Sequence, residues 1–201
     1  MIVVDGVVGV GKSTLMNILV EQGYVPFREP VDDNPILDKF YYDRKRYSFP
    51  LQVFFLNKRF KQIKEASKIH NSILDRSIYG DVIFAKMLCD NGEMEKEEFN
   101  LYRELLENML EHLEAPKLMI YLEASVDEAI RRIQKRGRDY EQIVERDYWQ
   151  HLNNEYSEYF KHYNKSPILK INVDNLDFEN NMEDREKVLS LISEKLKECS
   201  K

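Results

Sequence analysis

Two patterns of apolar residues divide the chain into predicted strands and helices. Short runs of consecutive apolar residues are typical of strands buried in a parallel sheet, and apolar residues three or four positions apart are typical of amphipathic helices. Strands are predicted at residues 2–5, 24–29, 72–75, 117–122 and 168–173. Helices are predicted at residues 12–22, 34–42, 48–67, 95–113, 126–136, 147–163 and 183–197, with one more beginning at 76–81. This alternation predicts an α/β fold, a five-stranded parallel sheet with helices on both faces and right-handed crossovers.

Length and composition agree with a single domain over residues 1–201. A hydrophobic content of 43% is enough for one substantial core. The net charge of −6 argues against a nucleic-acid partner, because the phosphates of nucleic acids favour basic surfaces. The cysteines and histidines show neither a disulfide framework nor metal-ligand spacing. No apolar run is long enough to span a membrane and the first strand leaves no room for a signal peptide, so we expect a cytoplasmic protein without a membrane partner.

A glycine-rich loop joins the first predicted strand to the first predicted helix. Residues 6–13 read Gly-Val-Val-Gly-Val-Gly-Lys-Ser, which is the GxxxxGKS form of a phosphate-binding loop in its required context. The glycines let backbone N–H groups face phosphate oxygens, and the helix N-terminus adds partial positive charge. Lys12 is expected to reach the β- and γ-phosphates of a nucleoside triphosphate, and the Ser13 hydroxyl to ligate Mg²⁺. The residues expected around the phosphates are Gly6, Gly9, Gly11, Lys12, Ser13 and Thr14.

Charged residues also end two other predicted strands. Glu29 ends the second strand, and Asp75 and Arg76 end the third. Ligands meet an open α/β sheet at the carboxyl ends of its strands. We therefore expect these side chains near the phosphate-binding loop, although a strand-end acid such as Glu29 can also be simply solvated.

A mixed stripe marks the long helix at 48–67. Gln52, Phe55 and Arg59 share one face of this helix. A polar, an aromatic and a basic residue on one stripe are unusual for a core seam. This face is therefore a candidate ligand-binding surface, with Phe55 adding bulk that would shape a pocket.

A later helix is strongly basic at its C-terminal end. Arg132 and Arg136 lie one turn apart, and Arg138 follows them. We expect an arginine-rich lid at about 132–141 that folds over a bound triphosphate. Arg131 lies on another face and is left out of this set. The alternative interpretation is a basic helix face in water.

The phosphate-binding loop alone leaves GTPases, ATPases and kinases open. A switch GTPase needs Asn-Lys-x-Asp, but residues 164–167 lack the aspartate, and no Asp-x-x-Gly element occurs. Across nearly the whole chain the sequence resembles the deoxynucleoside kinase family. The elements that carry the resemblance, in order, are the phosphate-binding loop, Glu29-Pro30, the helix with Gln52, Asp75-Arg76-Ser77 and the arginine lid. Residues 75–79 and 83–87 look most similar to bacterial deoxyadenosine/deoxycytidine kinases.

The resemblance implies a P-loop kinase fold and transfer of the γ-phosphoryl group from ATP to the 5′-hydroxyl of a deoxynucleoside. Glu29 is then the base that orients this hydroxyl and accepts its proton. Lys12, Mg²⁺ and the lid arginines stabilise the negative phosphoryl group. Arg76 bridges Glu29 and the transferring group, and Asp75 helps Ser13 to hold Mg²⁺.

The resemblance also implies how the deoxynucleoside is bound. Gln52 offers a donor and an acceptor that pair with a nucleobase edge. Arg59 and Asp81 form a charged pair at the far end of the base pocket, which favours cytosine or a purine over thymine. Tyr41, together with Glu141 from the lid, contacts the 3′-hydroxyl of the sugar. The expected acceptor is deoxyadenosine or deoxycytidine, with deoxyguanosine also open, in nucleotide salvage.

Two other functions remain open at this point. A nucleoside monophosphate kinase of the thymidylate kinase type shares the loop, the Asp-Arg strand end and the lid, but it needs extra cations to bind the phosphate of its acceptor. A nucleotide-binding regulatory protein would bind ATP without turnover. Family resemblance further implies a homodimer formed through residues 77–90 and 147–162.

Overall fold

The computed structural model describes residues 1–31, 34–137 and 144–199. Within these ranges, five parallel strands form one sheet in the order β2-β3-β1-β4-β5. The strands are β1 (Ile2–Gly6), β2 (Val25–Phe27), β3 (Ser72–Asp75), β4 (Leu118–Glu123) and β5 (Ile168–Asn172). The predicted five-stranded parallel sheet is therefore confirmed.

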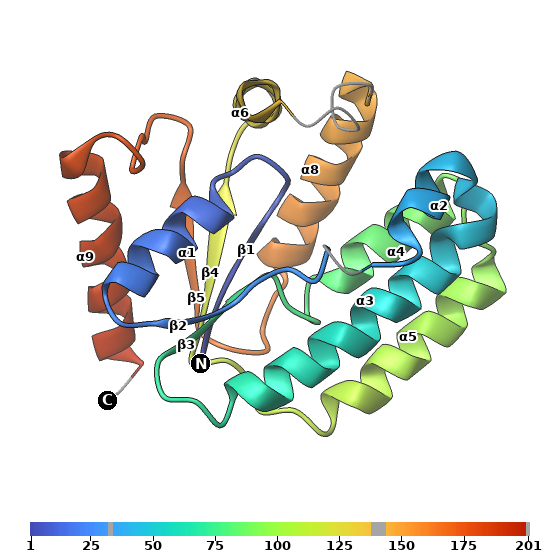
Figure 1. The fold of residues 1–201 in the computed structure, drawn as a ribbon, viewed down its shortest axis with the longest axis horizontal. Helices are drawn as coiled ribbons and strands as arrows, with labels where there is room; N and C mark the ends of the chain where they lie inside the picture. The colour runs from blue at the N-terminus through green and yellow to red at the C-terminus, as the bar shows by residue number, and fades with distance from the viewer. Residues whose placement is uncertain (32–33, 138–143, 200–201) are drawn as a thin grey trace.

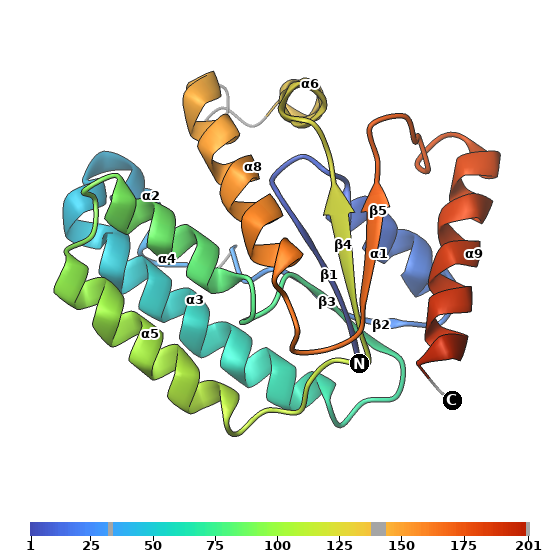
Figure 2. The same ribbon diagram turned by 180° about the vertical axis from the view of Figure 1, so that it is seen from behind.

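Helices cover both faces of the sheet, as predicted. They are α1 (Lys12–Glu21), α2 (Leu37–Tyr42), α3 (Arg44–Ala66), α4 (Asp81–Asp90), α5 (Lys96–Leu110), α6 (Val126–Arg136), α8 (Arg146–Lys161) and α9 (Met182–Glu198). Figure 1 shows α1 and α9 on one side of the sheet and α3, α4, α5 and α8 on the other, and Figure 2 shows the same arrangement from behind. Strands β1 and β3 are completely buried between these layers. The apolar runs Ile2-Val3-Val4 and Ile73-Leu74 reflect this two-sided burial.

Several element boundaries differ from the prediction, and two of these differences have a clear local cause. Strand β2 pairs with β3 only as far as Phe27, so Glu29 lies in the loop beyond the strand. Its carboxylate turns toward buried arginines of other elements instead of continuing the sheet. Helix α3 begins at Arg44, four residues before the predicted start, because the Asp43 side chain accepts a hydrogen bond from the Arg46 backbone and caps the helix.

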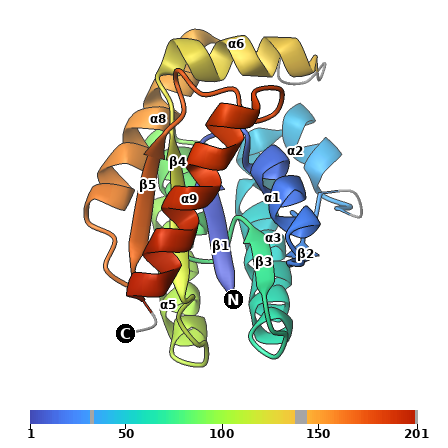
Figure 3. The ribbon, with the colours of Figure 1, turned by 90° about the vertical axis from the view of Figure 1, so that its left-hand side faces the viewer.

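The carboxyl ends of the strands lie at one edge of the sheet, and helix α6 lies across this edge (Figure 3). The loop between β1 and α1 reaches the same edge. Ligands of open parallel sheets bind at this edge. In the part of the chain that the structure describes, no helix is long and apolar enough to cross a membrane.

Candidate active site

The phosphate-binding loop is clamped between strand β4 and helix α6. A Cβ atom on Gly6 would lie 2.5 Å from the Leu122 carbonyl oxygen, and one on Gly9 would lie 2.6 Å from that of Ala129. Both glycines also have positive φ angles, +148° and +87°. Helix α1 begins after Gly11 without a side-chain cap and without acidic residues in its first turn. Its first N–H groups are therefore suited to an anion.

Lys12 is the buried cation of this loop. Its ammonium group donates hydrogen bonds to the Gly6 and Val7 carbonyls at 3.0 and 2.9 Å, and its side chain is only 8% exposed. Burial, followed by the repulsion of Arg76, lowers the pKa of Lys12 to about 7. A nearby polyanion would favour the charged form of this lysine.

A cavity of about 470 Å³ opens over the phosphate-binding loop. One wall is the loop and the start of α1, a second is the basic face of α6, and a third is the segment after β5. Its lining residues are Gly9, Gly11, Lys12, Ser13, Thr14, Arg131, Arg132, Lys135, Arg136, Leu176, Asp177, Phe178 and Glu179. Arg131, which is left out of the predicted set, also lines this cavity, and its guanidinium donates to the Glu128 carboxylate at 2.7 Å.

Arg132 holds the walls of this cavity together. Its guanidinium donates to the carbonyls of Val10 at 3.2 Å, Val173 at 2.7 Å and Leu176 at 3.0 Å. A fourth bond, from Nε, reaches the Glu128 carboxylate at 2.5 Å. Arg132 thus joins α6, the phosphate-binding loop and the end of β5.

Of the other lid residues, Arg136 lines the cavity. The predictions for Arg138 and Glu141 lie outside the described residues.

Ser13 and Asp75 meet below the cavity. The Ser13 hydroxyl donates to Asp75 Oδ2 at 2.9 Å. The other carboxylate oxygen, Oδ1, is buried and has no hydrogen-bond partner among the described residues. A hydroxyl and a carboxylate are oxygen ligands of the kind that Mg²⁺ prefers, and the orphaned oxygen is satisfied by a cation. These two side chains therefore fit the predicted Mg²⁺ site.

A chain of ion pairs runs beside the phosphate-binding loop. Arg59 Nε lies 2.9 Å from Asp81 Oδ1, and Arg59 Nη2 lies 2.8 Å from Glu29 Oε1. Arg76 Nε lies 3.2 Å from the same Glu29 oxygen. The predicted Arg59–Asp81 pair is therefore present, and the structure adds that Glu29 joins it to Arg76.

The Glu29 carboxylate is bound through one oxygen only. Oε1 faces both arginines, whereas Oε2 has no hydrogen-bond partner among the described residues. The side chain is 30% exposed. Burial alone would raise the pKa of Glu29, but the charges of Arg76, Arg59 and Lys12 outweigh it and lower the pKa to about 2. Glu29 is therefore ionised at any physiological pH, with one oxygen left to accept a hydrogen bond.

This lowered pKa predicts a pH-dependent contribution to stability. The carboxyl has a pKa of 4.5 in its ordinary state and about 2 in the fold, so its stabilising effect is complete above 4.5 and is lost as the pH falls toward 2. We expect the free-energy difference between wild type and Glu29→Gln, measured by urea unfolding, to shrink between pH 6 and pH 3.5. The exposed Glu65, paired with Lys61 at 3.8 Å, provides a control in Glu65→Gln, for which the difference stays small at both pH values. An unchanged Glu29 difference would contradict the lowered pKa.

The remaining predicted acceptor residues lie on α2 and α3. Gln52 is buried, with 5% exposure, and its amide makes no hydrogen bond with the described residues. Phe55 is half-buried, with the Arg59 guanidinium 5.5 Å from its ring centre, so the predicted stripe does share one face. Tyr41 is 38% exposed and packs edge-on against Phe40. The binding roles of Gln52, Phe55 and Tyr41 stay predictions.

Two residues next to Arg76 were missed in the sequence. Asp5 is buried at the end of β1, accepts a hydrogen bond from the Gly6 backbone at 2.8 Å, and lies 4.0 Å from Arg76 Nη1. Tyr156 of α8 is also buried, and its hydroxyl accepts a hydrogen bond from Arg76 Nη1. The strand-end rule that selected Glu29 applies equally to Asp5, whereas nothing in the local sequence distinguishes Tyr156 from a packing residue.

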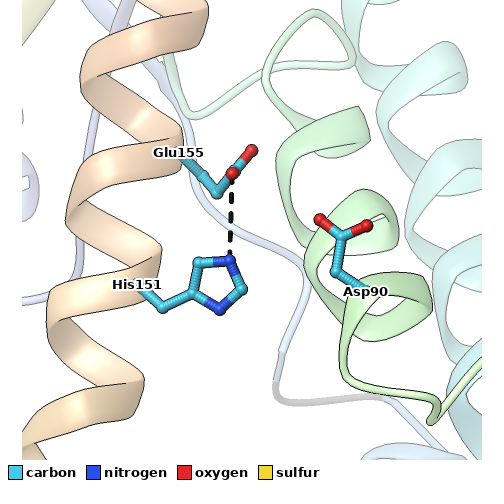
Figure 4. Close-up of side chains that lie close together, drawn as sticks. All are labelled: Asp90, His151 and Glu155. Atoms are coloured by element: carbon cyan, nitrogen blue, oxygen red, sulfur yellow. Dashed lines mark ion pairs between the residues drawn. The ribbon is translucent and has the colours of Figure 1, made fainter.

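A second cluster of polar side chains lies between α4 and α8 (Figure 4). Ligand atoms of Asp90, His151 and Glu155 lie within 4.8 Å of one another. The Lys86 ammonium, however, lies 2.6 Å from the Asp90 carboxylate and 3.0 Å from that of Glu155. Since a cation already neutralises both acids, we interpret the cluster as an ion-pair network that joins the two helices.

The fold and the site together define a P-loop phosphotransferase with a carboxylate next to its phosphate-binding loop. Residues 2–197 match the family model for deoxynucleoside kinase. The chain is 45% identical to a deoxyguanosine kinase of Lactobacillus johnsonii, over 100% of this chain and 94% of that one. It is 44% identical to a deoxyadenosine kinase of Lactobacillus acidophilus, over 98% and 96% of the two chains.

A solved structure of deoxyadenosine kinase from M. mycoides with bound dATP superposes with a TM-score of 0.84. The two sequences are 34% identical, and the match covers 96% of this chain and 98% of that one. The protein therefore belongs to the deoxynucleoside kinase family and has a P-loop kinase fold. The predicted family is confirmed, and neither the monophosphate kinase nor the regulatory alternative is favoured.

Proposed function

We propose that this protein transfers the γ-phosphoryl group of ATP to the 5′-hydroxyl of a deoxynucleoside in nucleotide salvage. The observation that carries this proposal is the Glu29 carboxylate, whose Oε1 is held by Arg59 and Arg76 beside the phosphate-binding loop. A carboxylate fixed in this way presents Oε2 to a neutral hydroxyl group. An acceptor that already carried a phosphate would place a second negative charge near Glu29, which disfavours the monophosphate kinase alternative.

The low pKa of Glu29 indicates how it acts. A carboxylate with a pKa of about 2 is a weak base, so its main work is to orient the 5′-hydroxyl and to accept its proton late in the reaction. Phosphoryl transfer passes through a loose transition state that depends more on position and charge than on a strong nucleophile. Glu29, Arg76 and Lys12 are accordingly the residues that we assign to catalysis.

The donor side supplies positive charge to the triphosphate. Lys12 and the backbone of the phosphate-binding loop would face the β- and γ-phosphates, and Arg132 and Arg136 line the cavity over this loop. Ser13 and Asp75 would hold Mg²⁺. When bound, this ion supplies charge neutralisation to the phosphate oxygens. We assign Arg138 to the same set by resemblance.

The base pocket ends at the pair of Arg59 and Asp81. Arg59 Nη1 and Asp81 Oδ2 are buried and have no hydrogen-bond partner among the described residues, so a donor and an acceptor remain for a nucleobase. Together with the Gln52 amide, they suit an adenine, cytosine or guanine edge. The relatives at 45% and 44% identity act on deoxyguanosine and deoxyadenosine by name, so membership of the family does not choose between purines.

A steady-state assay with ATP and Mg²⁺ against six acceptors tests the proposal. The acceptors are deoxyadenosine, deoxyguanosine, deoxycytidine, thymidine, adenosine and dTMP. We expect turnover of one or more of the first three, with thymidine and dTMP inert. Turnover of dTMP alone would move the protein to the monophosphate kinases. If ATP binds but no acceptor reacts, the regulatory function replaces the proposal.

The other parts of the proposal rest on the family resemblance. We infer a single catalytic domain over residues 1–201, with a lid at about 132–141. Tyr41 and Glu141 are assigned to the sugar 3′-hydroxyl. We also infer a homodimer and a cytoplasmic location. Light scattering tests the homodimer, because it compares the mass in solution with the monomer mass of 24.1 kDa.

A further inference from the structure

We propose that Tyr156 is a positioning residue that holds the Arg76 guanidinium in its orientation for phosphoryl transfer. This inference rests on the proposed function. Tyr156 lies on α8, 80 positions after Arg76 in the chain and outside the segments that carry the other candidate residues. Its side chain is 1% exposed, and its hydroxyl accepts a hydrogen bond from Arg76 Nη1.

The backbone of Arg76 has an unfavourable conformation, so the orientation of its side chain depends on contacts with other residues. It follows the last residue of β3 with a φ angle of 64°, in the left-handed region that non-glycine residues seldom occupy. Its N–H group donates to the Val4 carbonyl at 2.8 Å, which anchors the turn to β1. The side chain then leaves this turn into a buried space, with its charged carbon 5.1 Å from the centre of the Phe84 ring and 5.7 Å from that of Tyr156.

The three nitrogens of the guanidinium have different surroundings. Nε faces Glu29 Oε1 at 3.2 Å, and Nη1 is bound to the Tyr156 hydroxyl. Nη2 has no hydrogen-bond partner among the described residues. Nε is buried and makes no hydrogen bond, so among the described residues the bond from Nη1 to Tyr156 is the side-chain hydrogen bond that fixes the plane of the guanidinium. Nη2 is then left to bind an oxygen of the transferring phosphoryl group.

Removing the Tyr156 hydroxyl would release this orientation. The next acceptor for Nη1 is Asp5 Oδ1, which lies 4.0 Å away on β1. An unsatisfied buried donor is costly, so the guanidinium would turn toward Asp5 and move Nη2 away from its place. The ring itself packs against Phe84 and Phe160, with centroids 6.0 and 6.1 Å away, and phenylalanine would retain these contacts.

Helix α8 also provides a matched control. Tyr159 lies three residues after Tyr156, and its hydroxyl donates to the backbone carbonyl of Tyr79. Tyr159→Phe therefore removes one inward-facing hydroxyl bond from the same helix without touching Arg76. The two variants separate the loss of a hydrogen bond from the loss of Arg76 orientation.

The test measures kcat, the KM values and the thermal midpoint of Tyr156→Phe and Tyr159→Phe beside wild type, with the best acceptor of the six-acceptor assay. We expect Tyr156→Phe to lower kcat by about 10- to 100-fold with KM values within about threefold, since a small misplacement of a reacting group has effects of this size. Tyr159→Phe is expected to keep kcat within about twofold, with a comparable loss of thermal stability.

A double-mutant cycle with Arg76→Lys tests whether the effect of Tyr156→Phe on kcat depends on Arg76. A purely structural role of Tyr156 would not give this dependence. Lysine has no Nη1 atom, so adding Tyr156→Phe to Arg76→Lys is expected to lower kcat by less than about twofold. If the two losses multiply instead, or if Tyr156→Phe and Tyr159→Phe lower kcat equally, Tyr156 does not act through Arg76. Failure of wild type to phosphorylate any nucleoside would refute the proposed function, whereas an active wild type with unchanged Tyr156→Phe would refute this inference alone.

Discussion

Replacing Glu29 by glutamine is expected to lower kcat by about 10²- to 10⁴-fold, the usual contribution of a positioned base. The amide keeps the shape of the side chain, but it no longer accepts the proton of the 5′-hydroxyl. It also removes the negative charge that Arg59 and Arg76 share at 2.8 and 3.2 Å. The measurement is the steady-state rate with the best acceptor, together with the ATP dissociation constant by calorimetry.

ATP affinity should change little in Glu29→Gln, because Glu29 lies outside the cavity that opens over the phosphate-binding loop. Glu65→Gln, which removes the same charge from an exposed position on α3, is expected to retain wild-type turnover. A Glu29→Gln enzyme that keeps more than a tenth of wild-type kcat would show that another group receives the proton.

Replacing Lys12 by methionine is expected to lower kcat/KM by about 10²- to 10³-fold, as for loss of one preorganised charge that faces a transition state. Methionine has similar bulk and fills the buried space, but it cannot donate to the Gly6 and Val7 carbonyls or to a phosphate. Both the empty loop and the triphosphate complex therefore lose a cation. The assay is initial velocity over a range of ATP concentrations.

Lys135→Met is the matched control, since Lys135 lines the same cavity from the solvent-exposed side of α6. Its loss should change kcat/KM by less than about tenfold because an exposed charge is screened. Equal effects of the two substitutions would mean that the general positive charge of the cavity matters and not the placement of Lys12.

The sheet could be predicted because its central strands are buried on both faces. The sequences Ile2-Val3-Val4 and Leu118-Met119-Ile120 have no polar alternation, and this property depends only on neighbouring residues. The end of β2 was placed two residues too late, because Glu29 leaves the strand direction for Arg59 and Arg76. Those arginines are 30 and 47 positions further along the chain, beyond the reach of a local pattern.

The site could be predicted where a residue belongs to a motif or to a strand end. Lys12, Ser13 and Asp75 were found in this way; the Ser13 hydroxyl bonds to Asp75, and the Lys12 ammonium bonds to carbonyls of the phosphate-binding loop. Tyr156 was not, because its contact with Arg76 spans 80 positions and its own surroundings look like an ordinary helix core. Phe178 was missed for a similar reason, since only the fold brings the segment after β5 against Gly11.

Glu29 Oε1 is the point where two arginines with different tasks meet. In the proposed function, Arg59 connects this atom to Asp81 at the base end, and Arg76 connects it to the side where the phosphoryl group would bind. A base that draws Arg59 away changes the electrostatic balance at the same oxygen on which Arg76 depends. Under the proposed function, discrimination between bases is built into the chemical step as well as into affinity, and a poorly matched nucleoside is expected to stay slow even when it saturates the enzyme.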